Sequence, residues 1–468
     1  MAIDPTSPPH GDTDIAVRDE RGDLAADFVA AIDAALQADD STRVRELAGD
    51  LHESDLADLI ETIDADARPK LVRLLGDDFD FTALTELDET IRAQLLLELS
   101  PSAVAEAVLD LESDDAVAIL EDLEPDEQAA ILAEMPATNR LALARSLEYP
   151  EESAGRLMQT DFIAVPPFWN VGQAIDHMRE ATDLPDEFYE LFVVDPTYRP
   201  IGTVALNRLL RAKRPTVIAD LAEEIHTVSA TDDQEDVARV FERYNLVSAP
   251  VVDDAGRMLG VVTIDDVVDV IEEEADEDLR ALAGVGSEEE LSDNFWTIAR
   301  GRFAWLVVNL GTAIVASLVI GLFQDQLQQM VALAVLMPIV ASQGGNAGIQ
   351  TMTVAVRALA TRDLGPHNAL RIIGRELAVG ILNGLAFAII MGAVAYVWFR
   401  VPDLGIVIAL AMLTNLVAAA LGGILVPLVL DRLKADPAVS SSAFVTTVTD
   451  VVGFFAFLGI AAWWFGLR

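Results

Sequence analysis

Five long apolar segments in the C-terminal part of the chain constrain its fold more than any other feature. They lie at about 303–323, 329–357, 377–399, 404–430 and 441–466. Each is close to, or longer than, the roughly 20 residues that an α-helix needs to cross a bilayer. Lipid offers no partners for backbone N–H and C=O groups, so segments of this length must be helices. We therefore predict an all-α membrane domain of five spans over residues 297–468.

The remaining residues are strongly acidic. Residues 297–468 carry 7 acids and 10 lysines or arginines, whereas residues 1–296 carry 70 acids and 21 bases. Such a balance argues against nucleic-acid or anionic-lipid partners, which need clustered cations. With three lysines in the whole chain, the composition is typical of a halophilic protein. The chain has no cysteine, which excludes disulfides and thiolate metal sites.

Basic residues beside the spans predict the orientation. The N-terminus lacks both a basic region and an apolar core, so we expect no signal peptide and a cytosolic N-terminal part. The side shared with that part holds eight bases and the other side two, Arg400 and Arg468. Cytoplasmic loops are enriched in lysine and arginine. We expect a multi-pass protein of the cell membrane with cytosolic N-terminal domains and, because the span number is odd, an external C-terminus.

The soluble part divides into two blocks. Residues 23–150 repeat short segments with apolar residues at helical spacing, and Ser or Asp before each run can cap a helix. This pattern predicts an α-helical, superhelical N domain. Residues 1–22 have the polar composition of a disordered tail.

Residues 151–271 contain an internal repeat with a constant offset of 58 residues. Each copy reads strand, polar turn, strand, helix, and the glycine in each copy suits a close backbone approach. The repeated positions are Val193, Val194, Asp195, Arg199, Gly202 and Val204 in the first copy and Val251, Val252, Asp253, Arg257, Gly260 and Val262 in the second.

An acidic segment, residues 265–296, joins this repeat to the first span. On one helix, Glu274 and Asp278 lie four residues apart, and like charges at that spacing destabilise the helix. Hard oxygen ligands without His or Cys suit Mg²⁺ or Ca²⁺. The segment is thus either a cation-binding connecting helix or a solvated acidic helix face.

Asp450 is a lone carboxylate inside the last span. An acid there costs about 2.5 to 3.5 kcal/mol on insertion scales and usually marks an ion or proton path. An intramembrane aspartyl hydrolase would need a second carboxylate, but the other acids of this half lie at or near span ends. We expect no enzyme. We find no phosphate loop of the Gly-x-x-x-x-Gly-Lys-Ser/Thr type, which disfavours an ATP-driven pump.

The second span has polar, glycine-rich backbone at membrane depth. Pro338 is followed by Gly344, Gly345 and Asn346. Such backbone lines a wet cavity or allows tight helix packing.

Together these motifs resemble the MgtE family of Mg²⁺ transporters and channels. The resemblance rests on Pro338 with Gly344-Gly345-Asn346, on Asp436-Pro437-Ala438, and on Phe444, Thr446, Thr447, Thr449, Asp450, Gly453 and Phe454. The repeat resembles a tandem pair of CBS domains, 151–214 and 215–271, modules that commonly bind adenine nucleotides. The resemblance implies a multidomain membrane protein: helical N domain, α/β CBS pair, acidic connecting (plug) helix and five-span membrane domain.

The resemblance also implies an ion path. It implies a homodimer with a pore on the two-fold axis, where Asp450 from each protomer would bind hydrated Mg²⁺. The carbonyl of Thr446 and the polar groups of Asn346 and Thr353 are implied near that ion. ATP is a candidate ligand of the CBS pair, which could otherwise be a dimerising spacer. A membrane-tethered nucleotide or ion sensor without transport remains the alternative function.

Finally, the resemblance implies negative feedback by cytosolic Mg²⁺. Ions bound between the N domain, the CBS pair and the plug helix would hold the pore shut. The implied sensing residues are Glu235, Asp266, Asp269, Glu274, Glu277 and Asp278, with Asp114 and Asp115 as candidates in the N domain. Asn245 stands where the family pattern leads us to expect an acid.

Overall fold

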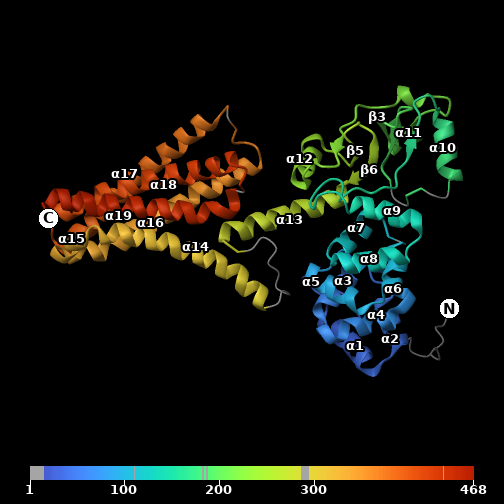
Figure 1. Ribbon diagram of the computed structural model, residues 1–468, viewed down its shortest axis with the longest axis horizontal. Coiled ribbons are helices and arrows are strands. Elements are labelled where there is room, and N and C mark those ends of the chain that lie inside the picture. Colours follow the sequence, from blue (N-terminus) through green and yellow to red (C-terminus); the bar gives the residue numbers. More distant parts are fainter. Residues whose placement is uncertain are drawn as a thin grey trace, which may run out of the picture. The chain divides into compact units, whose positions relative to one another are not determined.

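The computed structural model describes residues 15–109, 111–181, 184–185, 188–285, 295–365, 367–435 and 437–467. The chain forms two compact units, residues 1–272 and 273–468, which we describe separately (Figure 1). Residues 1–14 of the expected tail, 286–294 of the connecting segment, and Asp436 lie outside the described residues.

The first unit begins with an all-helical N domain around one hydrophobic core. Side chains cap several of its short helices: Asp40 accepts from the backbone N–H of Arg43, and Ser100 from that of Ala103. Ile15 and Val17, which we expected in the disordered tail, pack against this core. The helices are α1 (Ala26–Ala38), α2 (Ser41–Ala48), α3 (Glu53–Thr62), α4 (Arg68–Leu75), α5 (Glu89–Glu98), α6 (Pro101–Val108), α7 (Ser113–Glu121), α8 (Pro125–Glu134) and α9 (Ala137–Ser146), with 3-10 turns at Ala65–Ala67, Gly76–Asp78 and Phe81–Leu84.

Two small sheets follow, and they confirm the internal repeat. Val193 pairs with Gly202 in one sheet and Val251 with Gly260 in the other, so the register repeats at the same offset. A Cβ on Gly260 would lie 2.6 Å from the carbonyl oxygen of Gln159, which is the predicted close approach. The elements are β1 (Ala164–Val165), α10 (Val171–Glu180), β2 (Glu190–Val194), β3 (Pro200–Ala205) and α11 (Leu206–Arg211), then a 3-10 turn (Ile218–Asp220), β4 (Val228–Ser229), α12 (Gln234–Tyr244), β5 (Ser248–Val252) and β6 (Met258–Thr263).

A single helix, α13 (Ile264–Ala283), leads out of the second repeat and contributes residues to both units. It ends at Gly284, which has a φ of 73°. The N–H of Gly284 donates to the carbonyl of Ala281 and that of Val285 to the carbonyl of Arg280. This is a Schellman motif, in which a left-handed glycine satisfies the last carbonyls of a helix.

The second unit is helical, and its described residues include five helices long and apolar enough to span a membrane, as the sequence predicts. The central one, α18, is the most buried, and it packs against α16, α17 and α19 (Figure 1). Pro338 lies inside α16, where it removes one backbone donor. The helices are α14 (Phe295–Gly321), the short α15 (Gln324–Gln329), α16 (Val331–Ala360), α17 (Ala369–Phe399), α18 (Pro402–Arg432) and α19 (Pro437–Phe465).

Candidate metal sites

Four of the predicted sensing carboxylates come together in the first unit. Asp114 and Asp115 occupy the first turn of α7, and Asp266 and Asp269 lie in the first turns of α13. Asp114 is only 8% exposed. Asp266 repels Asp114, and Asp269 repels Asp115, strongly enough to affect their titration. We refer to these four residues as the acidic cluster.

Burial and mutual repulsion shift the titration of the acidic cluster. Burial raises the pKa of Asp266 to about 7, against the hydrogen bond that Thr263 Oγ1 donates to it at 2.7 Å. Burial and neighbouring acids raise the pKa of Asp115 to about 6 and that of Asp114 well above its usual value. Burial also raises the pKa of Asp269. Any positive charge placed among these carboxylates, whether protons or a divalent cation, therefore stabilises their packed arrangement.

Further acids contribute to this region, and the sequence did not single them out. Asp265 and Glu86 both repel Asp115 and Asp269, Glu53 repels Asp115, and Glu112 repels Asp114. Glu53 starts α3, and Glu86 precedes α5. They reach the cluster through the packing of separate helices, for which spacing along the chain gives no signal. Asp265 is the exception, because it directly precedes a residue that the sequence predicted.

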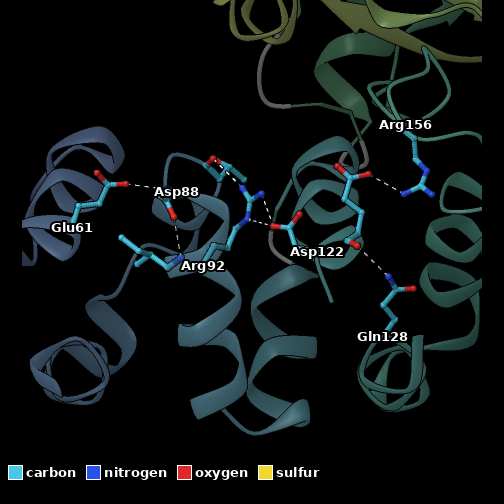
Figure 2. Close-up of polar contacts among 9 residues, drawn as sticks. Glu61, Asp88, Arg92, Asp122, Gln128 and Arg156 are labelled. Atoms are coloured by element: carbon cyan, nitrogen blue, oxygen red, sulfur yellow. Dashed lines mark hydrogen bonds and ion pairs between the residues drawn. The ribbon is translucent and has the colours of Figure 1, made fainter. Parts of the chain in front are cut away.

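The C-terminal end of α7 is anchored by two ion pairs (Figure 2). Arg92 Nε donates to Asp122 at 2.5 Å, and Arg156 pairs with Glu121 at 2.9 Å. Gln128 Nε2 donates to the carbonyl of Glu121 in the same region. Burial raises the pKa of Glu121 to about 7, although Arg156 opposes that shift. Since Arg156 opens the first CBS copy, this pair connects α7 to the CBS region.

The N-terminal end of α7 is anchored to the same region. The N–H of Thr160 donates to Ser113 Oγ at 2.7 Å, and Gln159 Nε2 donates to the carboxylate of Glu112. Contacts at both ends of α7 thus hold the turn that carries Asp114 and Asp115 against the first CBS copy.

The other predicted sensing residues lie elsewhere along the chain. Glu235 pairs with Arg239 on α12. Glu274, Glu277 and Asp278 lie on the part of α13 that belongs to the second unit. Asn245, where we expected an acid, ends α12 with a φ of 51°. Asparagine tolerates this left-handed conformation better than most residues, which gives Asn245 a structural role.

In the second unit, polar side chains form a stripe along α16. The stripe is exposed on this chain, and its residues recur every three or four positions, as one face of a helix requires. Its members are Ser342, Asn346, Gln350, Thr353 and Arg357. The sequence reasoning named Asn346 and Thr353 but missed Ser342 and Gln350, which counting in helical steps from Asn346 would have found. Polar groups on the outside of a spanning helix need water or protein beside them.

Asp450 lies half-buried in the middle of α19, with Thr446 one turn before it. Thr446 Oγ1 donates to the carbonyl of Ser442 at 2.9 Å. The carbonyl oxygen of Thr446, implied to lie near the ion, accepts from Thr449 Oγ1 at 2.9 Å. That carbonyl already accepts one hydroxyl hydrogen bond.

The last turns of α13 pack onto α16 and α19, the helices that carry the polar stripe and Asp450. Ala281, 2% exposed, belongs to a buried cluster with Met352 and Val356 of α16 and with Ala438 and Val445 of α19. A displacement of this end of α13 would therefore alter the packing of the helices that carry the polar stripe and Asp450.

Among the described residues, no group of three or more His, Cys, Asp or Glu side chains is arranged to hold a metal ion. Within the described ranges, neither candidate site surrounds a metal ion completely with protein ligands. Mg²⁺ keeps several of its waters in most protein sites, so an incomplete set of carboxylates suits it.

Comparison with known proteins defines the class of the chain. A family model described as "Divalent cation transporter" (MgtE) matches residues 337–460, which include α18 and most of α16 and α19. The model "MgtE intracellular N domain" matches residues 51–152, and the CBS domain model matches 154–214 and 218–273. The chain is thus a membrane protein of the divalent-cation transporter class with an appended CBS pair.

Full-length relatives give the family. The magnesium transporter MgtE of Enterococcus faecalis is 35% identical over 317 residues, which cover 68% of this chain and 70% of that protein. MgtE of Thermus thermophilus is 35% identical over 323 residues, 68% of this chain and 71% of its own. A solved cytosolic domain of the Mg²⁺ channel MgtE in complex with ATP is 29% identical, covers 52% of this chain and 99% of its own, and has a TM-score of 0.48. The chain belongs to the MgtE family of magnesium transporters.

Proposed function

We propose that this chain carries Mg²⁺ across the cell membrane along a channel-like path lined by the polar stripe of α16 and by Asp450. The observation that carries the proposal is the stripe itself. Its four uncharged members, Ser342, Asn346, Gln350 and Thr353, lie on one face of a membrane helix beside a helix with a lone carboxylate, where contact with lipid is unfavourable. Facing water, they can bind a hydrated cation.

The chemistry of these groups suits Mg²⁺ as the transported ion. Mg²⁺ prefers oxygen ligands and gives up its waters reluctantly. Asp450 offers a carboxylate, and Asn346 and Gln350 offer amide oxygens that can accept from retained waters. The path needs no thiolate or imidazole, the ligands that would favour Zn²⁺ or Cu²⁺.

A homodimer would complete the path. Asn346 and Thr353 are exposed on a single chain, and an isolated chain would present them to lipid. A second copy related by a two-fold axis would cover both stripes and face one Asp450 toward the other. Two carboxylates near one axis favour a divalent over a monovalent ion.

The proposed orientation puts the first unit in the cytosol and the C-terminus outside. It is supported by the eight basic residues beside the spans on the side of the first unit, against two on the other.

Cytosolic Mg²⁺ would close the path through the acidic cluster. Asp114, Asp115, Asp266 and Asp269 would hold the regulatory ion, and this assignment is supported by their raised pKa values, since burial and mutual repulsion disfavour their charged forms. When Mg²⁺ is scarce, their repulsion would free the start of α13. Its other end packs on α16 and α19, which supports α13 as the gating element.

The CBS pair is the candidate site for ATP. The proposal is supported by the two matched CBS copies. Equilibrium dialysis of the full chain with labelled ATP tests it, and saturable binding is expected. Labelled CTP is the control, and ATP binding no tighter than CTP binding would contradict the proposal.

Flux of Mg²⁺ into proteoliposomes tests the transport proposal. Asp450→Asn is expected to lower flux at least about tenfold, because it removes the charge that attracts the ion. Asp403→Asn, an exposed acid at the start of α18, is the matched control and should keep wild-type flux. Equal flux in wild type and Asp450→Asn would refute the path and favour a membrane-tethered sensor.

A further inference from the structure

A buried amide lies where three helices of the membrane unit meet. Asn415 of α18 is 1% exposed, and its Nδ2 donates to the carbonyl oxygen of Val340 in α16 at 2.8 Å. Its Oδ1 is also buried, without a hydrogen-bond partner among the described residues. A buried polar group that is only half satisfied costs free energy, so an apolar residue would pack more favourably at this position.

Two glycines make room for this amide. A Cβ on Gly344 of α16 would lie 2.1 Å from Asn415 Nδ2, and a Cβ on Gly453 of α19 would lie 2.7 Å from the same atom. For both glycines, the three nearest atoms to such a Cβ all belong to Asn415. The side chain of Asn415 is therefore clamped between α16 and α19, and any residue other than glycine would collide with it.

The clamp lies next to the residues of the proposed ion path. Gly344 comes two residues before Asn346, which is about 200° around the helix, so Asn346 faces away from Asn415. Gly453 comes three residues after Asp450, so the two lie about 60° apart on neighbouring turns of the same face of α19. The bonded carbonyl of Val340 lies between Pro338 and Gly344, in the turn that leads from the proline to the Gly-Gly-Asn motif. Asn415 thus contacts α16 on the side away from Asn346 and α19 close to Asp450, so it touches the backbone that carries both residues.

We infer that Asn415 is a positioning residue for transport, which sets the distance and rotation of α16 relative to α19 through Gly344 and Gly453. This inference rests on the proposed ion path. Close packing elsewhere along the same helices would transmit the constraint: a Cβ on Gly423 of α18 would lie 2.6 Å from the carbonyl oxygen of Gly348. Because the three helices pack this closely, a shift of the helix backbone at the clamp must move the groups that line the path.

A double-mutant cycle on Mg²⁺ flux, normalised to reconstituted protein, tests the contact. Gly344→Ala and Gly453→Ala should each lower flux about tenfold or more. Combining either with Asn415→Ala should restore flux to the level of Asn415→Ala alone, because the colliding atoms are gone. Gly374→Ala, where a Cβ meets nothing within 4 Å, is the matched control and should keep wild-type flux. If adding Asn415→Ala does not restore the flux lost in the two glycine variants, the clamp is wrong.

The Mg²⁺ dependence of flux separates positioning from a purely structural role. Asn415→Ala should raise the Mg²⁺ concentration for half-maximal flux several-fold and weaken the preference for Mg²⁺ over K⁺, while its elution on gel filtration stays that of wild type. Unchanged half-maximal concentration and selectivity would overturn the inference. If Asp450→Asn keeps full flux, the proposed path itself fails; if Asp450→Asn is inactive and Asn415→Ala behaves as wild type, only the positioning role fails.

Discussion

Replacing Asp266 by asparagine should tighten the packing of α13 when no Mg²⁺ is present. The asparagine keeps the shape of the side chain and can still accept the hydrogen bond from Thr263 Oγ1. It removes the charge whose burial raises the pKa from 3.8 to about 7. About three pKa units correspond to up to about 4 kcal/mol of unfavourable free energy in the ionised, packed state.

The pH dependence follows from the direction of this shift. A carboxyl with a raised pKa binds its proton more tightly in the packed state, so protonation stabilises packing. That stabilisation is complete below about pH 3.8 and is lost as the pH rises to about 7. Wild type and Asp266→Asn should therefore differ most at pH 8 and converge toward pH 5.

Hydrogen exchange of the full chain in detergent and EDTA measures this effect. At pH 8, amides in the first turns of α13 should exchange at least about tenfold more slowly in Asp266→Asn than in wild type. Asp254→Asn, an exposed residue of the β5–β6 turn, is the matched control and should exchange like wild type. Equal exchange in wild type and Asp266→Asn at both pH values would refute the idea that repulsion in the acidic cluster opens this helix.

Three further results are expected. Arg156→Ala leaves Glu121 without its ion pair, so the amides of α7 should exchange faster and closure should need more Mg²⁺; unchanged exchange of α7 would contradict this role. Gln350→Leu removes a polar group from the stripe and should lower Mg²⁺ flux several-fold, whereas Gln328→Leu in α15 should not; equal flux in both would remove Gln350 from the path. At pH 7 the acidic cluster retains protons, so Mg²⁺ binding should release protons into a weakly buffered solution, and at pH 9 it should not; release that is the same at both would contradict the raised pKa values.

The sequence predicted most of the architecture because each element has its own periodic signal. Five spans follow from segment length, and the offset of 58 residues predicted two copies of one strand–turn–strand–helix unit; the structure adds that both pair in the same register, Val193 with Gly202 and Val251 with Gly260. The ordered residues Ile15 and Val17 were not predicted, because two apolar residues in a polar stretch carry no periodicity.

Site residues were less predictable, because contacts between separate helices decide them. The approach of Asp114 to Asp266 depends on how α7 packs beside α13, and no spacing along the chain encodes that. Asn415 was missed because a single asparagine in an apolar span gives no pattern; its role emerges only beside Gly344 and Gly453. Ser342 and Gln350, by contrast, could have been found from the sequence at helical spacing from Asn346.

The most direct test of the whole mechanism is Mg²⁺ flux through the wild-type chain in proteoliposomes while Mg²⁺ is varied on the side of the first unit, at fixed high KCl. If this chain combines an ion path with its own Mg²⁺ sensor, flux should be high when that side is free of Mg²⁺ and should fall steeply as Mg²⁺ rises, and replacing both Asp115 and Asp266 by asparagine should remove the dependence. Flux that is independent of Mg²⁺ on that side would contradict gating by the acidic cluster, and absence of flux under all conditions would contradict transport.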